Sequence, residues 1–125
     1  MHSFRLLSLS IVAACSATLA TPALAQATYP DRPVKVIVAL PAGGSVDMIA
    51  RVVSQKLAAE MGQPFVVDNR AGASGQIGVP AVAKAAPDGY TLMVSPASFL
   101  TTNKSIFKTL PYNPATDFTP ITKLV

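Results

Sequence analysis

Residues 34–45 read VKVIVALPAGGS, and this stretch decides the fold that the sequence predicts. Its first seven residues are almost wholly apolar and rich in β-branched side chains, which is typical of a strand buried on both faces of a parallel sheet. Pro41 and the pair Gly43 and Gly44 end that strand sharply. Over residues 46–61, apolar side chains recur at steps of three and four, which predicts a helix with one apolar face.

Both ends of this helix carry local signals. Ser45 is the expected N-cap, and Asp47 in the first turn suits the positive end of the helix dipole. Gly62 is the expected stop, with Pro64 just beyond it. We therefore expect the helix to begin directly after the glycine pair.

The alternation of strand and helix continues toward the C-terminus. Strands are expected at residues 65–68 and 90–94, a helix at 77–86, a weak helix at 99–107 and a further extended segment at 118–125. Pro80 requires the second helix to begin close before it, because an interior proline costs about 3 kcal/mol. This order predicts an α/β sandwich whose parallel strands are joined by right-handed crossovers.

The first 25 residues have the three parts of a secretory signal peptide. Arg5 gives a positive start, residues 6–20 are apolar apart from Ser and Thr, and Pro22 breaks any helix. Cleavage is expected after Ala25, with Ala27 as the alternative site. The apolar stretch is shorter than the roughly 20 residues that a membrane span needs, which disfavours an anchor.

Cysteine and histidine occur once each, and both lie in that leader. Cys15 ends a VAAC run that resembles a lipoprotein box, but it lies inside the apolar stretch, so simple export to the periplasm is favoured over lipidation. After cleavage the chain keeps neither His2 nor Cys15. It then has no Ser-His or Cys-His nucleophile pair and no His/Cys zinc site. We expect no enzyme, no metal and no other cofactor.

Charge excludes one class of partner. The chain has 10 Lys and Arg against 6 Asp and Glu. The basic residues are scattered singly, whereas a nucleic-acid interface needs them clustered. We expect no nucleic-acid partner.

Three loops leave the carboxyl ends of the predicted strands, where open α/β sheets bind their ligands. They span residues 41–45, 69–78 and 95–98 and are rich in small residues. At the helix start after Gly43 and Gly44, free N–H groups and the helix dipole attract an anion. A tight turn without a ligand is the alternative role of this glycine pair.

Five stretches of the chain carry a family resemblance. They read YPDRPVKVIV, LPAGGSVDMIAR, GQPFVVDNRAGASGQIG, VAKAAPDGYTL and LPYNPATDFTPIT, in this order, and cover nearly all of residues 29–125. In order and spacing they resemble the Bug family, the TctC-type periplasmic substrate-binding proteins of tripartite tricarboxylate transporters.

The resemblance implies a periplasmic-binding-protein-like lobe of type II, with a mostly parallel sheet flanked by helices. Family members are much longer and have two α/β lobes that close over a small anionic ligand, often a carboxylate. Residues 26–125 are then the N-terminal part of the first lobe, incomplete and without the second lobe. We expect such a fragment to be marginally folded, with an uncovered sheet edge prone to association. A small complete domain is the alternative.

The function implied is capture of a small carboxylate, or another small anionic solute, and its delivery to the membrane permease subunits of the transporter. Asp47 then holds the first loop or touches the ligand, or it is only an acid at a helix start. Ser95 and Ser98 are either ligand contacts or solvent-facing turn residues. The expected ligand-binding residues are Ala42, Gly43, Gly44, Ser45, Asp47, Ala73, Ser74, Gly75, Ser95, Ala97 and Ser98.

Two other classes of function stay open. One is a secreted Rossmann-like domain that binds a nucleotide or phosphate, although Gly72, Gly75 and Gly78 follow the spacing G-x-x-G-x-x-G rather than G-x-G-x-x-G. The other is a hydrolase that uses the hydroxyl of Ser74 or Ser45. The absence of histidine and the isolated acids leave such a serine without an evident general base, which disfavours an enzyme.

Overall fold

Three parallel strands form the centre of the structure, a computed structural model that describes residues 28–124. The strand order is β2-β1-β3, and Val36 at the middle of β1 pairs with Val67 of β2 and Leu92 of β3. The predicted parallel sheet is confirmed, whereas the expected leader, its cleavage site and Cys15 lie outside the described residues. The strands are β1 Val34–Val38, β2 Phe65–Asn69 and β3 Thr91–Val94.

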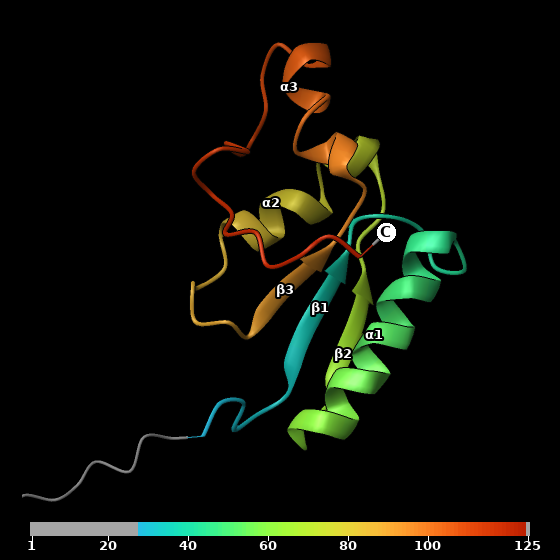
Figure 1. Cartoon of the computed structure of the whole chain (residues 1–125). Helices are drawn as coiled ribbons and strands as arrows, with labels where there is room; N and C mark the ends of the chain where they lie inside the picture. The colour runs from blue at the N-terminus through green and yellow to red at the C-terminus, as the bar shows by residue number, and fades with distance from the viewer. Residues whose placement is uncertain (1–27, 125) are drawn as a thin grey trace, which may run out of the picture.

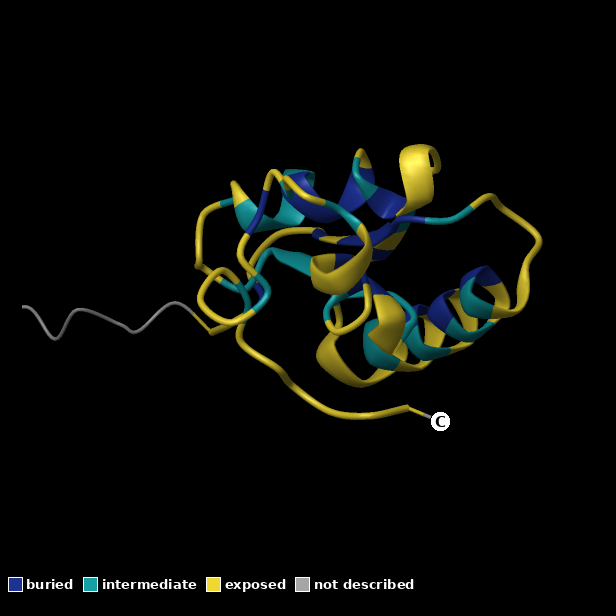
Figure 2. Ribbon diagram, turned by 90° about the horizontal axis from the view of Figure 1, so that it is seen from above, coloured by how far each residue is buried: buried dark blue, intermediate teal, exposed yellow. Residues whose placement is uncertain are grey.

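Two helices lie on opposite faces of the sheet (Figures 1 and 2). Helix α1 packs over β1 and β2, where Val36 and Phe65 form a buried cluster with the half-buried Leu57. Helix α2 packs over β1 and β3, where Val79 contacts Ala39 just beyond the end of β1. The helices are α1 Ser45–Met61 and α2 Gly78–Ala83.

The start of α1 differs from the prediction by one residue. Gly44 is the N-cap and Ser45 is the first helical residue, so the expected capping bond from the Ser45 hydroxyl is absent. The other end is as predicted: Gly62 adopts a left-handed conformation (φ 70°), and its N–H donates to the Ala58 carbonyl at 3.0 Å. Met61, expected on the apolar face, is exposed because it lies in the last turn.

The second half of the chain is less regular than predicted. Pro80 is the third residue of α2, where its missing N–H costs no helical hydrogen bond, so the expected start close before Pro80 is confirmed. The predicted helix over residues 99–107 divides into a 3-10 turn, η2 (Ala97–Phe99), and a short helix, α3 (Asn103–Ile106).

Residues 118–124 are not a strand, contrary to the prediction. Pro120 lacks the N–H that a strand interior needs, and residues 119–124 are exposed. They run past the sheet on the side that α1 occupies (Figure 2). Ahead of them, Phe118 packs edge-on against Tyr112, with ring centroids 5.9 Å apart.

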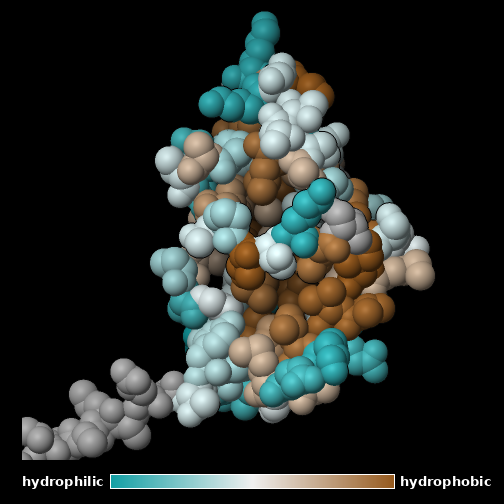
Figure 3. Space-filling model, viewed as in Figure 1, coloured by the Kyte–Doolittle hydropathy of each residue, from teal (hydrophilic) through white to brown (hydrophobic). Residues whose placement is uncertain are grey.

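Strand β3 is incompletely covered on the α1 side. Leu92 and Val94 stay half-buried, since α1 lies over β1 and β2. Apolar side chains gather at the surface beside α1 on this face (Figure 3).

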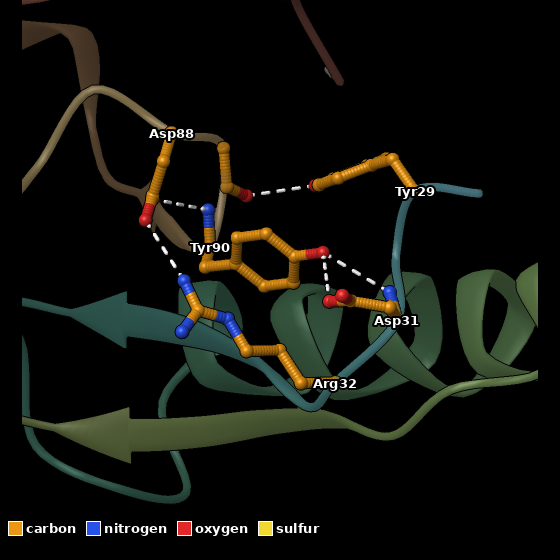
Figure 4. A network of polar contacts seen from close by, with 6 residues as sticks. Tyr29, Asp31, Arg32, Asp88 and Tyr90 are labelled. Atoms are coloured by element: carbon orange, nitrogen blue, oxygen red, sulfur yellow. Dashed lines mark hydrogen bonds and ion pairs between the residues drawn. The ribbon is translucent and has the colours of Figure 1, made fainter. Parts of the chain in front are cut away.

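A polar cluster closes the amino end of the sheet, opposite the predicted ligand loops (Figure 4). The Tyr90 hydroxyl donates to the Asp31 carboxylate at 2.6 Å, and the Arg32 guanidinium lies 4.1 Å from the Tyr90 ring centroid. Arg32 also pairs with Asp88 at 3.0 Å. The Tyr29 hydroxyl donates to the Gly89 carbonyl, which links the segment before β1 to the turn before β3.

Candidate functional site

The three predicted loops lie at the carboxyl edge of the sheet, as the parallel topology requires (Figure 1). Residues 39–44 follow β1, residues 70–77 follow β2 and residues 95–102 follow β3. Their small residues leave backbone groups at the surface.

The first loop leads directly into α1. Gly43 has a φ of 84°, in the left-handed region that glycine adopts without strain. The helical hydrogen bonds begin at the Met48 N–H, which donates to the Gly44 carbonyl at 3.0 Å. The preceding N–H groups of the first turn have no acceptor within the helix and carry its positive dipole end. A shallow hollow of about 220 Å³ lies here, lined by Leu40, Pro41, Gly44, Ser45, Val46 and Asp47.

Asp47 is turned inward and holds this loop. Its side chain is only 4% exposed, and its Oδ2 accepts hydrogen bonds from the Gly43 N–H at 2.8 Å and from Arg51 Nε at 3.0 Å. Its Oδ1 accepts a hydrogen bond from the side-chain amide of Asn69 at 2.9 Å. Both carboxylate oxygens are thus occupied, which favours the loop-holding role of Asp47 over direct contact with a ligand.

Asn69 connects three elements at this edge. Its Nδ2 donates to the Leu40 carbonyl at 3.2 Å as well as to Asp47, and its Oδ1 accepts from Arg51 at 3.1 Å. Neither Asn69 nor Arg51 was predicted from the sequence as a site residue, although Asn69 begins the predicted second loop. The signal for Asn69 was present, since a polar residue at the end of a parallel strand lies at the ligand edge.

The Asp47 carboxyl is strongly acidic. The hydrogen bond from Arg51 is the largest cause that lowers its pKa from 3.8 to about 2, followed by the hydrogen bonds from the Gly43 N–H and the Asn69 amide, while burial opposes the shift. Asp47 therefore stays ionised at neutral pH. Arg51 balances its charge, so an anion at the helix start does not meet an unpaired carboxylate.

The second loop holds two non-glycine residues in the left-handed region. Ala73 has a φ of 47° and Ser74 a φ of 54°, within the 3-10 turn η1 (Ala73–Gly75). Such conformations are disfavoured for L-residues and concentrate at functional sites. Gly75 is buried against the ring of Phe99, so that an added Cβ would lie 2.7 Å from a ring carbon.

The third loop contacts the second through Phe99. Phe99 is 8% exposed and was not predicted as a site residue, whereas the predicted Ala97 and Ser98 are exposed and Ser95 is half-buried. Among the predicted site residues, the structure therefore brings Gly43 into contact with Asp47. It also brings Gly75 into contact with the third loop, through Phe99.

Two buried polar side chains that were not predicted from the sequence lie behind the second and third loops. Asn103 of α3 donates to the Ser74 carbonyl at 3.1 Å and to the Tyr112 hydroxyl at 3.2 Å. No local pattern indicated this, because Asn103 and Ser74 are 29 residues apart.

Two kinds of feature are absent from the described part of the chain. Among residues 28–124, no group of three or more His, Cys, Asp or Glu side chains lies placed to hold a metal ion. No helix within the same range is long and apolar enough to cross a membrane.

A parallel sheet between two helices, with small-residue loops at its carboxyl edge, defines an α/β lobe of the periplasmic-binding-protein type. Residues 49–125 match the family model described as the tripartite tricarboxylate transporter family receptor, TctC. The chain belongs to this family.

Known relatives agree with that assignment. Over 122 residues the chain is 44% identical to Protein BugT of Bordetella pertussis, covering 97% of this chain and 37% of the relative. An R. palustris protein solved with adipate is 43% identical (TM-score 0.71), and MatC from Rhodopseudomonas palustris, with bound malate, is 39% identical (TM-score 0.70). Both structural matches cover 74% of this chain and 31% of the other. The chain spans about a third of the length of the curated relatives it matches.

Proposed function

We propose that this chain supplies one wall of a receptor cleft that captures a small carboxylate for a tripartite tricarboxylate-type transporter. The observation that carries the proposal is the start of α1, where first-turn N–H groups lie beside a hollow and the nearby Asp47 charge is balanced by Arg51. A helix N-terminus of this kind stabilises a negatively charged group. Adipate and malate in the two structural relatives support a dicarboxylate as the ligand class.

Family membership supports the remaining parts of the proposal. Residues 1–25 export the chain to the periplasm, and residues 26–125 form the N-terminal part of the first lobe. A second lobe closes the cleft, and the permease subunits receive the solute. The predicted residues of the three loops are the ligand-binding set, with Asp47 as the support of the first loop.

The chain acts as a receptor without catalysis. Ser45 at the start of α1 and Ser74 in the second loop are both exposed, and none of the hydrogen bonds of the described acids reaches either hydroxyl. A serine without a base is a weak nucleophile.

A titration of the ¹⁵N-labelled full chain, followed by NMR, tests the proposal. Adipate and malate are expected to shift the amide signals of Gly44, Ser45 and Val46, with affinities of about 1 mM for one open wall. Adipamide has the shape of adipate without its charges and is expected to shift none of them. Shifts produced by ATP but by neither dicarboxylate would favour a nucleotide-binding domain instead.

A matched pair of variants locates the site. Gly44→Val places a branched side chain over the hollow and is expected to weaken binding at least about tenfold. Ala59→Val adds the same side chain at an exposed position of α1 and is expected to bind like the parent. Equal binding by both variants would exclude the start of α1 as the ligand site.

A chimera tests the same loops inside a closed cleft. Residues 28–124 replace the matching segment of the R. palustris protein solved with adipate. The chimera is expected to bind adipate within about tenfold of that protein, because its second wall is unchanged.

A further inference from the structure

A buried pair of polar side chains lies behind the second and third loops. Asn103 is 5% exposed and Tyr112 is 6% exposed. The Asn103 amide donates to the Ser74 carbonyl at 3.1 Å and to the Tyr112 hydroxyl at 3.2 Å. The Tyr112 hydroxyl in turn donates to the Phe99 carbonyl at 2.6 Å. One continuous chain of hydrogen bonds thus joins both loops.

The Ser74 carbonyl belongs to a turn in an unfavourable backbone conformation. Ala73 and Ser74 are the two non-glycine residues there with positive φ, and they are adjacent. This conformation persists only where the surroundings hold it. The hydrogen bond from Asn103 is such a constraint, since it fixes the peptide plane that follows Ser74.

The turn at Ala73 and Ser74 is also closed by hydrogen bonds of its own backbone. The Gly75 and Gln76 N–H groups close the turn onto the carbonyls of Gly72 and Ala73, at 3.0 and 3.1 Å. The turn is therefore fixed from within and, through Asn103, from behind.

The Tyr112 hydroxyl extends the same constraint to the third loop. It holds the carbonyl of Phe99, and the ring of Phe99 fills the space beside Gly75 that a Cβ would occupy. A change in the position of Tyr112 must therefore move both loops. Tyr112 comes from the irregular segment after α3, which connects that segment to the ligand edge.

We propose that Asn103 and Tyr112 are positioning residues that hold residues 73–75 and 97–99 in the conformation that binds a carboxylate. They act from behind the loops and touch no ligand themselves. The inference rests on the proposed function and adds the residues that set its second and third loops.

Two isosteric variants remove these hydrogen bonds, and a third serves as the control. Asn103→Asp replaces the donating amide with an acceptor, and Tyr112→Phe removes only the hydroxyl. Thr116→Val removes a hydroxyl of the segment that carries Tyr112, which donates to the Asp117 carboxylate at 2.9 Å and reaches neither loop.

Amide hydrogen exchange in the full chain separates local positioning from general stability. In Asn103→Asp and Tyr112→Phe, the Gly75 and Gln76 amides are expected to exchange at least about tenfold faster than in the parent. The Val36 and Val38 amides of β1 are expected to keep the parent rates in both variants, and the Thr116→Val control is expected to keep the parent rates throughout. Equal acceleration in β1, or no acceleration at Gly75, would show that the pair is not a positioning unit.

Binding by the chimera gives the second measurement. Asn103→Asp and Tyr112→Phe are each expected to weaken adipate binding about tenfold, whereas Thr116→Val is expected to bind like the parent chimera. If the parent chimera binds adipate and both variants bind it with unchanged affinity, the inference is overturned. A parent chimera that binds no dicarboxylate contradicts the proposed function instead, and the exchange rates then decide whether the pair fixes the loops.

A double-mutant comparison tests the strain directly. Glycine adopts positive φ without the steric penalty of Ala73 and Ser74. In the Ala73→Gly/Ser74→Gly background, Asn103→Asp is therefore expected to lose less affinity than in the parent background. Identical losses in both backgrounds would mean that Asn103 does not act through this strained turn.

Discussion

The side-chain amide of Asn69 donates to the carboxylate of Asp47 at 2.9 Å and so fastens the carboxyl end of β2 to the first turn of α1. The same amide reaches the Leu40 carbonyl at 3.2 Å, beyond the end of β1. The loop between β1 and α1 is therefore held by the side chain of Asp47 in α1 and by that of Asn69 at the end of β2.

This arrangement predicts a specific response to acid. The pKa of Asp47 is lowered to about 2 from its ordinary value of 3.8. Its contribution to stability is then fully present above pH 3.8 and is lost as the pH falls through that interval toward about 2. Thermal unfolding of the parent and of Asp47→Asn, followed by circular dichroism across this interval, measures the effect.

Asp47→Asn is expected to be less stable than the parent above pH 3.8, with the difference shrinking as the pH approaches about 2. Arg51→Gln is the matched control, because it keeps the carboxylate and removes the largest cause of the shift. In that variant the loss of stability on acidification is expected to be smaller and to end at a higher pH, because the pKa of Asp47 in the folded state lies closer to 3.8. Parallel curves for all three proteins would contradict the assignment.

Gly78 at the start of α2 predicts a steric effect. A Cβ at this position would lie 2.7 Å from the Arg70 carbonyl oxygen and 2.8 Å from the Ala39 Cα. Both are backbone atoms of the sheet edge and cannot rotate away. Gly78→Ala is expected to lower the free energy of unfolding by about 1–3 kcal/mol, despite the better helix propensity of alanine.

Gly44→Ala is the control for this measurement by urea unfolding. Its Cβ would lie 3.7 Å from the Pro41 carbonyl oxygen, an ordinary contact, and Gly44 has a φ of −78°. We expect its stability to change by less than about 0.5 kcal/mol. A loss at Gly44 equal to that at Gly78 would show that space is not the deciding factor.

The sequence predicted those features that depend on local pattern. The β-branched run of β1 and the three- and four-residue spacing in α1 each reflect burial of a single element. The parallel order then places the loops at one edge without further information. The loop set, including Gly43 and Gly75, was therefore accessible from the sequence.

The missed features depend on contacts between distant segments. Ser45 has a preferred capping side chain, but the Asp47 carboxylate takes the Gly43 N–H, and the helix begins at Ser45. The buried role of Asn103 depends on Ser74, and residues 118–124 lack a neighbouring strand among the described residues. Such outcomes are set by packing, which periodicity does not encode.

A buried hydroxyl on α1 predicts a stabilising substitution. Ser54 is 3% exposed, and its Oγ has no hydrogen-bond partner among the described residues. A buried polar group without a partner costs free energy, and alanine is the better helix former. Ser54→Ala is therefore expected to raise the free energy of unfolding by about 1 kcal/mol in urea titrations.

Gln55→Ala separates the effect of the buried hydroxyl from that of helix propensity. Gln55 is exposed on the same helix, so its replacement changes helix propensity alone. Its gain is expected to be a few tenths of a kcal/mol at most. If Ser54→Ala destabilises the protein, the hydroxyl must have a partner in solution.

At the opposite end of the sheet, the cluster around Tyr90 predicts a response to alkali (Figure 4). The hydrogen bond to the Asp31 carboxylate is the largest cause that raises the Tyr90 pKa above 10.0, since ionisation would place two negative charges together. The stability that Tyr90 contributes is fully present below pH 10.0 and is lost as the pH rises through the higher pKa of the folded state.

Asp31→Asn tests this cause, because it removes the negative charge and retains the side-chain shape. Its phenolate absorbance is expected to show one tyrosine titrating at a lower pH than in the parent, while Tyr90→Phe loses that titration altogether. Asp88→Asn is the control, since it removes the partner of Arg32 and leaves the Tyr90–Asp31 hydrogen bond in place. An identical titration of Tyr90 in Asp31→Asn and the parent would mean that the carboxylate does not control it.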